Sequence, residues 1–388
     1  MSELAKTRTN TATIKWSLLT SVSAVTLAAL FPTATLASEA TKPTVWIELG
    51  VQLERLTDGQ EPYFPPFAQL LDSSFTSPNE VQRPPRYSFG QEGRISLAPE
   101  GSNWIFSAAL RYGRSNRKAN VHDENTFQAS PIGIESIPFV GKYLTGAYPI
   151  SQQRQANTVS QIRENHLVLD FTAGKDVGLG LFGSHENSVL NLGVRFAQFT
   201  SRSKTRIDAL PNVAISYKYI SSIGGLPAYI KFPSANWNIF VGKMDAARSF
   251  TGIGPSLSWD GNATLFGNEE ASEVTLDWGL NGALLFGRQK MTAHRTTMAH
   301  RYTQANFSGA LPTVYPTNVR NTDRSRSVIV PNVGGFAGLS LRFPNAKVSL
   351  GYRIDAFFGA MDGGIDTRKT YDRNFYGPFA TISIGLGG

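Results

Sequence analysis

Apolar and polar side chains alternate with a period of two residues in many segments of this chain. That period is typical of a β-strand whose two faces meet different environments. In residues 44–54 the odd-numbered positions are apolar, while Glu48, Gln52 and Glu54 lie on the opposite face. Residues 347–356 repeat the pattern, with Arg353 on the polar face.

The same alternation predicts ten strands of about 11 to 16 residues, which is long enough to cross a bilayer at a tilt. They are expected at residues 44–56, 87–98, 103–113, 162–174, 188–200, 246–260, 274–287, 327–342, 347–358 and 375–386.

The segments between the expected strands are alternately longer and shorter. The longer ones are residues 57–86, 114–161, 201–245, 288–326 and 359–374, and the shorter ones are 99–102, 175–187, 261–273 and 343–346. Outer-membrane barrels alternate short periplasmic turns with long external loops in this way. Residues 99–102 (Pro-Glu-Gly-Ser) and 343–346 (Phe-Pro-Asn-Ala) also have the composition of compact hairpin turns. The longer segments, rich in proline and polar residues, are expected to be loops rather than barrel wall.

These features predict one all-β domain over residues 38–388. It would be a transmembrane, antiparallel, up-and-down β-barrel of about ten strands, with eight or twelve possible, short periplasmic turns and long external loops. A soluble β-sandwich is the alternative, because its strands alternate as well. Strand length, loop alternation and the N-terminal segment favour the membrane.

The N-terminal segment resembles a signal peptide. Lys6, Arg8 and Lys15 precede an apolar run at residues 16–31, and small residues follow near residues 35–37. We therefore expect residues 1–37 to be a signal peptide; an uncleaved membrane anchor is the alternative, although the run is short for a span of about 20 residues.

Composition narrows the function classes further. The chain has 388 residues, of which 17% are charged, with 36 glycines and no cysteine. The absence of cysteine excludes disulfides and thiolate chemistry and suits an exported protein. Removing residues 1–37 lowers the formal charge from +8 to +6, and no dense Lys/Arg block remains. We therefore expect no nucleic-acid partner.

Five segments together have a familiar pattern: Gly351–Phe358, Met361–Gly364 and Arg373–Phe379, with Gly252–Leu257 and Leu284–Gly287. They resemble segments of one known family, the Legionella-type major outer membrane proteins. The resemblance covers mainly the last 150 residues or so and implies a pore-forming barrel in a bacterial outer membrane.

One departure from outer-membrane barrels concerns the C-terminus. Such barrels commonly end in an aromatic residue that the barrel-assembly machinery recognises, whereas this chain ends Ile-Gly-Leu-Gly-Gly. Either the two glycines overrun the usual end, or an internal aromatic residue such as Phe379 serves in its place.

The polar faces supply the candidate functional residues. The pore-lining candidates are Glu48, Glu92, Arg94, Arg111, Asp170, Arg195, Asp277, Arg342, Arg353 and Asp355; Glu54 also belongs to this face. Such charges either line water or pair with one another, because burying them unpaired costs several kcal/mol each. Ten strands enclose little space, so the first alternative is a narrow, water-filled pore for ions or small polar solutes. The second is a closed lumen filled by ion pairs, in a structural or adhesive surface protein.

An unusually apolar part of one predicted loop, residues 132–149, contains Ile137, Phe139 and Tyr143. It is expected to fold into the lumen as a constriction; packing on the rim or contacting a partner are alternatives. The long loops as a group offer contact with a host surface.

No catalytic, metal or cofactor site is predicted. His166 and Asp170 lie four residues apart on one strand face, about 13 Å, which is too far for direct contact. His294 and His300 lack a metal-binding spacing, and no nucleophile elbow or phosphate loop occurs. The sequence does not specify the oligomeric state.

Overall fold

The computed structural model describes residues 45–58, 87–99, 102, 104–127, 147–177, 188–220, 230–268, 271–304, 311–314, 317–365 and 367–386. The chain divides into Met1–Thr41 and Lys42–Gly388, and all the described elements lie in the second unit. The expected signal peptide and the expected constriction residues Ile137, Phe139 and Tyr143 fall outside the described residues. Within the described part, no helix has the length and apolarity needed to cross a membrane.

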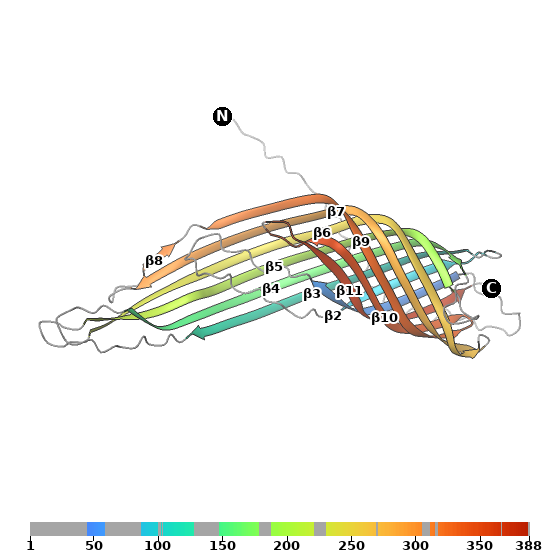
Figure 1. Cartoon of the computed structure of the whole chain (residues 1–388), viewed down its shortest axis with the longest axis horizontal. Helices are drawn as coiled ribbons and strands as arrows, with labels where there is room; N and C mark the ends of the chain where they lie inside the picture. The colour runs from blue at the N-terminus through green and yellow to red at the C-terminus, as the bar shows by residue number, and fades with distance from the viewer. Residues whose placement is uncertain are drawn as a thin grey trace, which may run out of the picture. The chain divides into compact units, whose positions relative to one another are not determined.

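Every described element is a β-strand (Figure 1). The strands are β1 (Val45–Asp58), β2 (Tyr87–Leu97), β3 (Trp104–Phe127), β4 (Ala147–Asp176), β5 (Ser188–Ile220), β6 (Ile230–Asn268), β7 (Ser272–Gln304), β8 (Leu311–Val314), β9 (Asn318–Phe343), β10 (Ala346–Asp362) and β11 (Thr370–Leu386).

The strands close into an antiparallel, up-and-down barrel. Hydrogen-bonded neighbours run in the order β6-β5-β4-β3-β2-β1-β11-β10-β9-β7, and pairing between β6 and β7 completes the ring. The short strand β8 pairs only with the end of β7, so ten strands form the wall. The predicted fold class and strand count are therefore confirmed.

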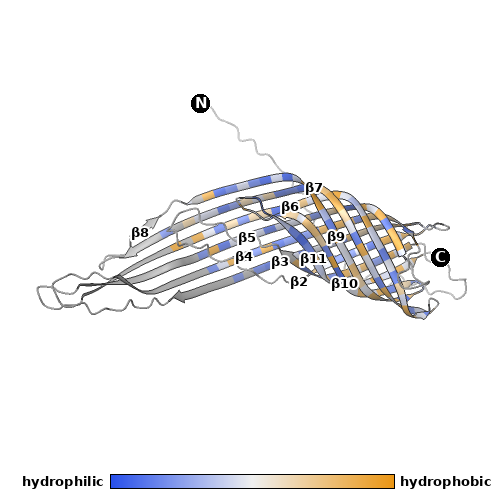
Figure 2. Cartoon of the chain, viewed as in Figure 1, coloured by the Kyte–Doolittle hydropathy of each residue, from blue (hydrophilic) through white to orange (hydrophobic). Residues whose placement is uncertain are grey.

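Where all ten strands run together, the outer face of the wall is apolar and the charged side chains lie on the inner face, the reverse of a soluble core. One continuous row across six strands shows this pattern: Leu110, Leu169, Phe196, Ile253, Phe286 and Ile329 are direct cross-strand neighbours on the outer face. Outward side chains such as Leu192 and Leu350 are 65% and 62% exposed, whereas inward Asp355 is 1% exposed. Figure 2 shows the orange, hydrophobic positions gathered where all ten strands run together. The outer face suits lipid, and the soluble sandwich does not fit.

Aromatic side chains flank the apolar band on both sides. Trp259 and Trp278 stack edge to face, with ring centroids 4.8 Å apart, near the end that carries the short turns. Tyr87 and Tyr112 are exposed at the opposite edge. Such girdles mark the two interfaces of a bilayer.

Two tight turns occur where the sequence predicts them. The amide of Ser102 donates to the carbonyl of Pro99 at 3.1 Å, which closes the turn between β2 and β3. Phe343 pairs directly with Ala346, so only two residues connect β9 to β10. We refer to this side of the barrel as the turn end and to the opposite side as the extended end.

The predicted strand lengths are wrong for most of the wall. Strands β3–β7 and β9 have 24 to 39 residues and continue past the apolar band at the extended end. Much of the predicted loops 114–161, 201–245 and 288–326 is therefore strand. Beyond the band both faces carry polar residues, so the period of two in hydrophobicity disappears although backbone pairing continues.

Candidate functional site in the barrel lumen

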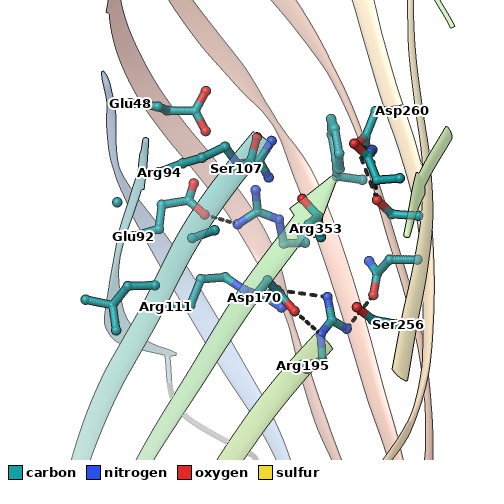
Figure 3. Close-up of a pocket in the computed structure, with 18 of the residues that line it drawn as sticks. Glu48, Glu92, Arg94, Ser107, Arg111, Asp170, Arg195, Ser256, Asp260 and Arg353 are labelled. Atoms are coloured by element: carbon teal, nitrogen blue, oxygen red, sulfur yellow. Dashed lines mark hydrogen bonds and ion pairs between the residues drawn. The ribbon is translucent and has the colours of Figure 1, made fainter. Parts of the chain in front are cut away.

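The barrel wall brings six of the predicted pore-lining charges together in the lumen, as three ion pairs near its middle. Figure 3 shows two of these pairs, Arg195 with Asp170 and Arg353 with Glu92. Arg195 on β5 binds Asp170 on the adjacent strand β4 at 2.6 Å. Arg111 on β3 pairs with Asp355 on β10, and Arg353 on β10 pairs with Glu92 on β2. Because β3 and β10 are not neighbours in the sheet, the Arg111 pair reaches across the lumen. These contacts join residues up to 261 positions apart in the sequence.

Arg195 has the largest set of partners in this layer. Its guanidinium donates two hydrogen bonds to Asp170, one to Asn281 on β7 at 2.7 Å and one to Asn332 on β9. Asn332 in turn donates to the carbonyl of Ala356 on β10 at 3.0 Å. One buried side chain therefore connects four strands, and its network extends to a fifth.

Arg353 combines its ion pair with two aromatic contacts. Its guanidinium carbon lies 4.7 Å from the ring centroid of Phe379 and 5.7 Å from that of Phe336. Cation–π contacts of this kind are strongest where the cation is desolvated, and Arg353 is 7% exposed. Arg353 and Asp355 share the inner face, as predicted, but each pairs with a residue on a distant strand instead of with the other.

The remaining predicted charges lie nearer the turn end. Asp277 accepts hydrogen bonds from Lys347 at 3.1 Å and from Ser340 at 2.6 Å. Arg342 binds Glu273 at 3.3 Å. The hydroxyl of Ser383 donates to Glu48 at 2.9 Å.

Two cavities, of about 90 and 150 Å³, lie among these charged side chains. Glu48, Arg94, Asp260 and Arg353 line both of them. Each cavity is large enough for several water molecules, and its polar lining favours hydration. The turn-end half of the lumen is thus a charged vestibule with room for water.

An apolar layer packs inside the lumen beyond the vestibule. Phe199 on β5, Phe250 on β6 and Phe357 on β10 are all fully buried. The Phe199 ring lies 4.7 Å from that of Phe357 and 5.7 Å from that of Phe250, centroid to centroid. We call this group, with its packed neighbours, the aromatic layer: Leu56, Val168, Phe199, Phe250, Leu285, Val330, Phe357 and Phe375.

Sequence reasoning missed the aromatic layer. Phe357 has the same strand parity as Arg353 and Asp355, and Phe199 has the same parity as Arg195. Extending the polar face by two to four residues would therefore have located apolar side chains in the lumen. Strand parity therefore contained the information, but an inward apolar residue in a strand does not stand out from ordinary strand sequence.

A second charged cluster lies on the extended side of the aromatic layer. Glu164 on β4 accepts from Arg373 on β11 at 2.6 Å and from Arg117 on β3 at 2.9 Å. His166, the register partner of Phe199, lies at the level of the aromatic layer; it binds Glu54 at 3.2 Å, and its ring lies 4.3 Å from that of Phe375, centroid to centroid. His166 and Asp170 thus have different partners, which fits the predicted separation.

The turn between β10 and β11 folds inward at the same end. Gly363, Gly364 and Ile365 are buried, and Arg324 on β9 holds this turn through Asp362 at 3.1 Å and the carbonyl of Gly364 at 2.6 Å. An inward constriction therefore exists in the described part of the barrel, but it comes from residues 362–365, in a segment expected to be an external connection. Whether residues 132–149 add another remains a prediction, because only 147–149 are described, within β4.

Within the described ranges, no group of three or more His, Asp or Glu side chains has an arrangement that would hold a metal ion. The described lumen instead offers paired charges, small polar cavities and the aromatic layer.

Comparison with known proteins gives no family for this chain. No family model matches it, and no curated protein matches it. Similar solved structures include the Pseudomonas putida toluene transporter TodX, with 10% identity, coverage of 89% of this chain and 91% of that chain, and a TM-score of 0.18. The transport unit of the autotransporter AIDA-I from Escherichia coli has 7% identity, coverage of 91% and 93%, and a TM-score of 0.17. At these scores neither carries an argument about function, and the resemblance to the Legionella-type family stays a prediction.

Proposed function

We propose that this protein is a narrow, gated channel of a bacterial outer membrane that conducts ions or small polar solutes. The turn end faces the periplasm in this proposal, because short turns are periplasmic in outer-membrane barrels. The proposal includes no catalytic step and no cofactor. Lipid surrounds the apolar band, and the barrel-assembly machinery is the expected insertion partner.

The observation that carries the proposal is the shape of the barrier in the lumen. Charged, cavity-containing space occupies the turn-end half, and a further charged cluster lies beyond the aromatic layer. The apolar side chains that close the lumen in this proposal belong mainly to one layer, in which Phe199, Phe250 and Phe357 meet. Hydrophobic constrictions of this kind gate by excluding water, and a change of side-chain rotamer or a small shift of the wall opens them. Vestibule charges of both signs favour weak ion selectivity.

The test is single-channel conductance of the folded protein in planar bilayers, comparing the unmodified barrel with a Phe199→Ala/Phe357→Ala variant. The unmodified barrel is expected to open rarely, with small steps. The variant removes two rings from the aromatic layer and is expected to open more often and conduct more. Phe286→Ala is the matched control, because Phe286 is 51% exposed on the outer face; its conductance should equal that of the unmodified barrel.

A closed-lumen surface protein is the second candidate function. The observation that favours it is the length of β4–β7, at 30 to 39 residues, which builds a sheet past the band at the extended end. Such a sheet suits contact with another surface. If the Phe199→Ala/Phe357→Ala variant folds, shown by heat-modifiable migration, and still conducts nothing, the channel proposal is wrong and this second function is favoured.

A further inference from the structure

A belt of basic side chains lies on the outer face of the wall, just past the apolar band at the extended end. Five successive cross-strand rows, from the Tyr112 row to the Asn120 row, carry nine outward basic residues and two acidic ones, Asp245 and Asp323. The basic residues, which we call the basic belt, are Arg114, Lys118, Arg163, Arg202, Lys204, Arg206, Lys243, Arg288 and Lys290, all exposed.

The belt begins where lipid contact ends. The Leu110 row is apolar on all six strands, the next row contains Tyr112 and Arg288, and the one after it contains Arg114 and Lys290. The Arg163 row lies four residues past Tyr112, about 13 Å along the strand and about 10 Å above it at a tilt of about 40°. Long arginine and lysine side chains at this height reach the headgroup region.

Two arginines at the centre of the belt face each other directly. Arg163 on β4 and Arg202 on β5 are register partners on the outer face. Directly opposed side chains have Cβ atoms about 5 Å apart, and like charges there are destabilising. Among the described residues, neither guanidinium has an acidic partner. The opposed arginines do not stabilise the fold by themselves. The pair therefore points to an anion from outside the protein that binds both guanidinium groups.

Two other cations of the same belt already have acidic partners. Lys204 lies 3.6 Å from Asp245, and Arg206 binds Asp208 at 2.8 Å. The other seven residues of the belt have no acidic partner among the described residues, and Arg163 and Arg202 are the one pair of these seven that face each other directly in the register. Planar guanidinium groups bind phosphate through two parallel hydrogen bonds, which makes this pair a better phosphate ligand than a lysine pair.

We infer that the Arg163–Arg202 pair binds the phosphate groups of phosphorylated lipid headgroups in the outer leaflet, so that the basic belt fixes the depth of the barrel in the membrane. Lipid phosphate is favoured over free phosphate because the pair lies on the lipid-facing side of the wall, directly past the apolar band. The inference needs the membrane orientation but not conductance, so it can succeed or fail independently of the channel proposal.

The test measures binding of fluorescently labelled, diphosphorylated lipid A to the folded barrel in zwitterionic detergent, followed by anisotropy. Arg163→Gln/Arg202→Gln is expected to weaken binding about 25-fold, because each surface cation contributes about a factor of five. Lys204→Gln/Arg206→Gln removes the same net charge from cations that already have acidic partners. This control is expected to stay within about twofold of the unmodified protein.

Two further measurements complete the test. Urea unfolding separates an effect on lipid recognition from an effect on folding, and displacement by inorganic phosphate separates a lipid site from a site for free phosphate. Without lipid, Arg163→Gln/Arg202→Gln should unfold at the same or a higher urea concentration, because it relieves repulsion. If the double variant does not fold, the two single variants should each weaken binding about fivefold. Equal binding by the unmodified protein and both double variants would overturn the inference. Displacement of the lipid by inorganic phosphate at equal phosphate concentration would also overturn it, since the site would then take free phosphate.

Discussion

Replacing Arg195 by methionine tests whether the charged layer of the lumen is a buried network or a water-lined wall. Arg195 is 5% exposed and donates to Asp170, Asn281 and Asn332. Methionine keeps most of the side-chain length but removes every donor. The change therefore leaves one carboxylate and two amide oxygens without their common partner.

The expected loss differs between the two alternatives. Removing one partner of a buried ion pair costs about 3 to 5 kcal/mol, because the remaining charge is left without compensation. A solvated pair contributes only about 0 to 1 kcal/mol. The cavity of about 90 Å³ lined by Arg195 and Asp170 has room for water beside this ion pair. We therefore expect the lower end of the buried range, a loss of about 3 kcal/mol in the free energy of unfolding.

A double variant identifies the cause of that loss. Arg195→Met/Asp170→Asn removes the stranded carboxylate as well, and it should recover more than half of the stability lost in Arg195→Met. The assay is urea unfolding of the barrel refolded in zwitterionic bilayers, followed by tryptophan fluorescence. Arg202→Met on the same strand is the control, and as an exposed substitution it should change stability by no more than about 0.5 kcal/mol.

Two results would refute this reasoning. A loss below about 1 kcal/mol for Arg195→Met would mean that water solvates the layer and that the ion pairs do not stabilise the barrel. A double variant as unstable as Arg195→Met would mean that the loss comes from packing of the side chain and not from the unpaired charge of Asp170.

Two other predictions concern the outer band and the inward turn. Val194→Lys, at an outward position in the middle of the apolar band, should cost about 2 to 4 kcal/mol in bilayers. Thr292→Lys, past the band, should cost close to nothing, and equal urea midpoints for the two variants would show that the band is misplaced. Arg324→Gln should speed hydrogen exchange at the Gly363 and Gly364 amides at least about tenfold, because it removes charge-assisted hydrogen bonds to the turn. Arg326→Gln, whose partner is Gln289 on β7, should leave this exchange unchanged.

The barrel itself could be predicted from the sequence because the pattern that specifies its strands lies within each strand segment. A strand with lipid on one side and polar lumen on the other alternates with a period of two, and this signal survives within each segment separately. The turns at 99–102 and 343–346 were predictable for the same reason, since turn chemistry depends on adjacent residues. The inward side of Glu92, Arg111 and Arg353 followed from strand parity alone.

The partners of those charges depend on the closed barrel. Arg353 could not be matched to Glu92, or Arg111 to Asp355, because strand register and barrel closure together decide which side chains meet across the lumen. The extended strands were missed because backbone pairing persists where the hydrophobic alternation has ended. Within the apolar band, sequence thus determined which way each wall residue points, a property of the single strand. Only the tertiary structure decided what lies opposite, because the two sides of a lumen belong to distant parts of the chain.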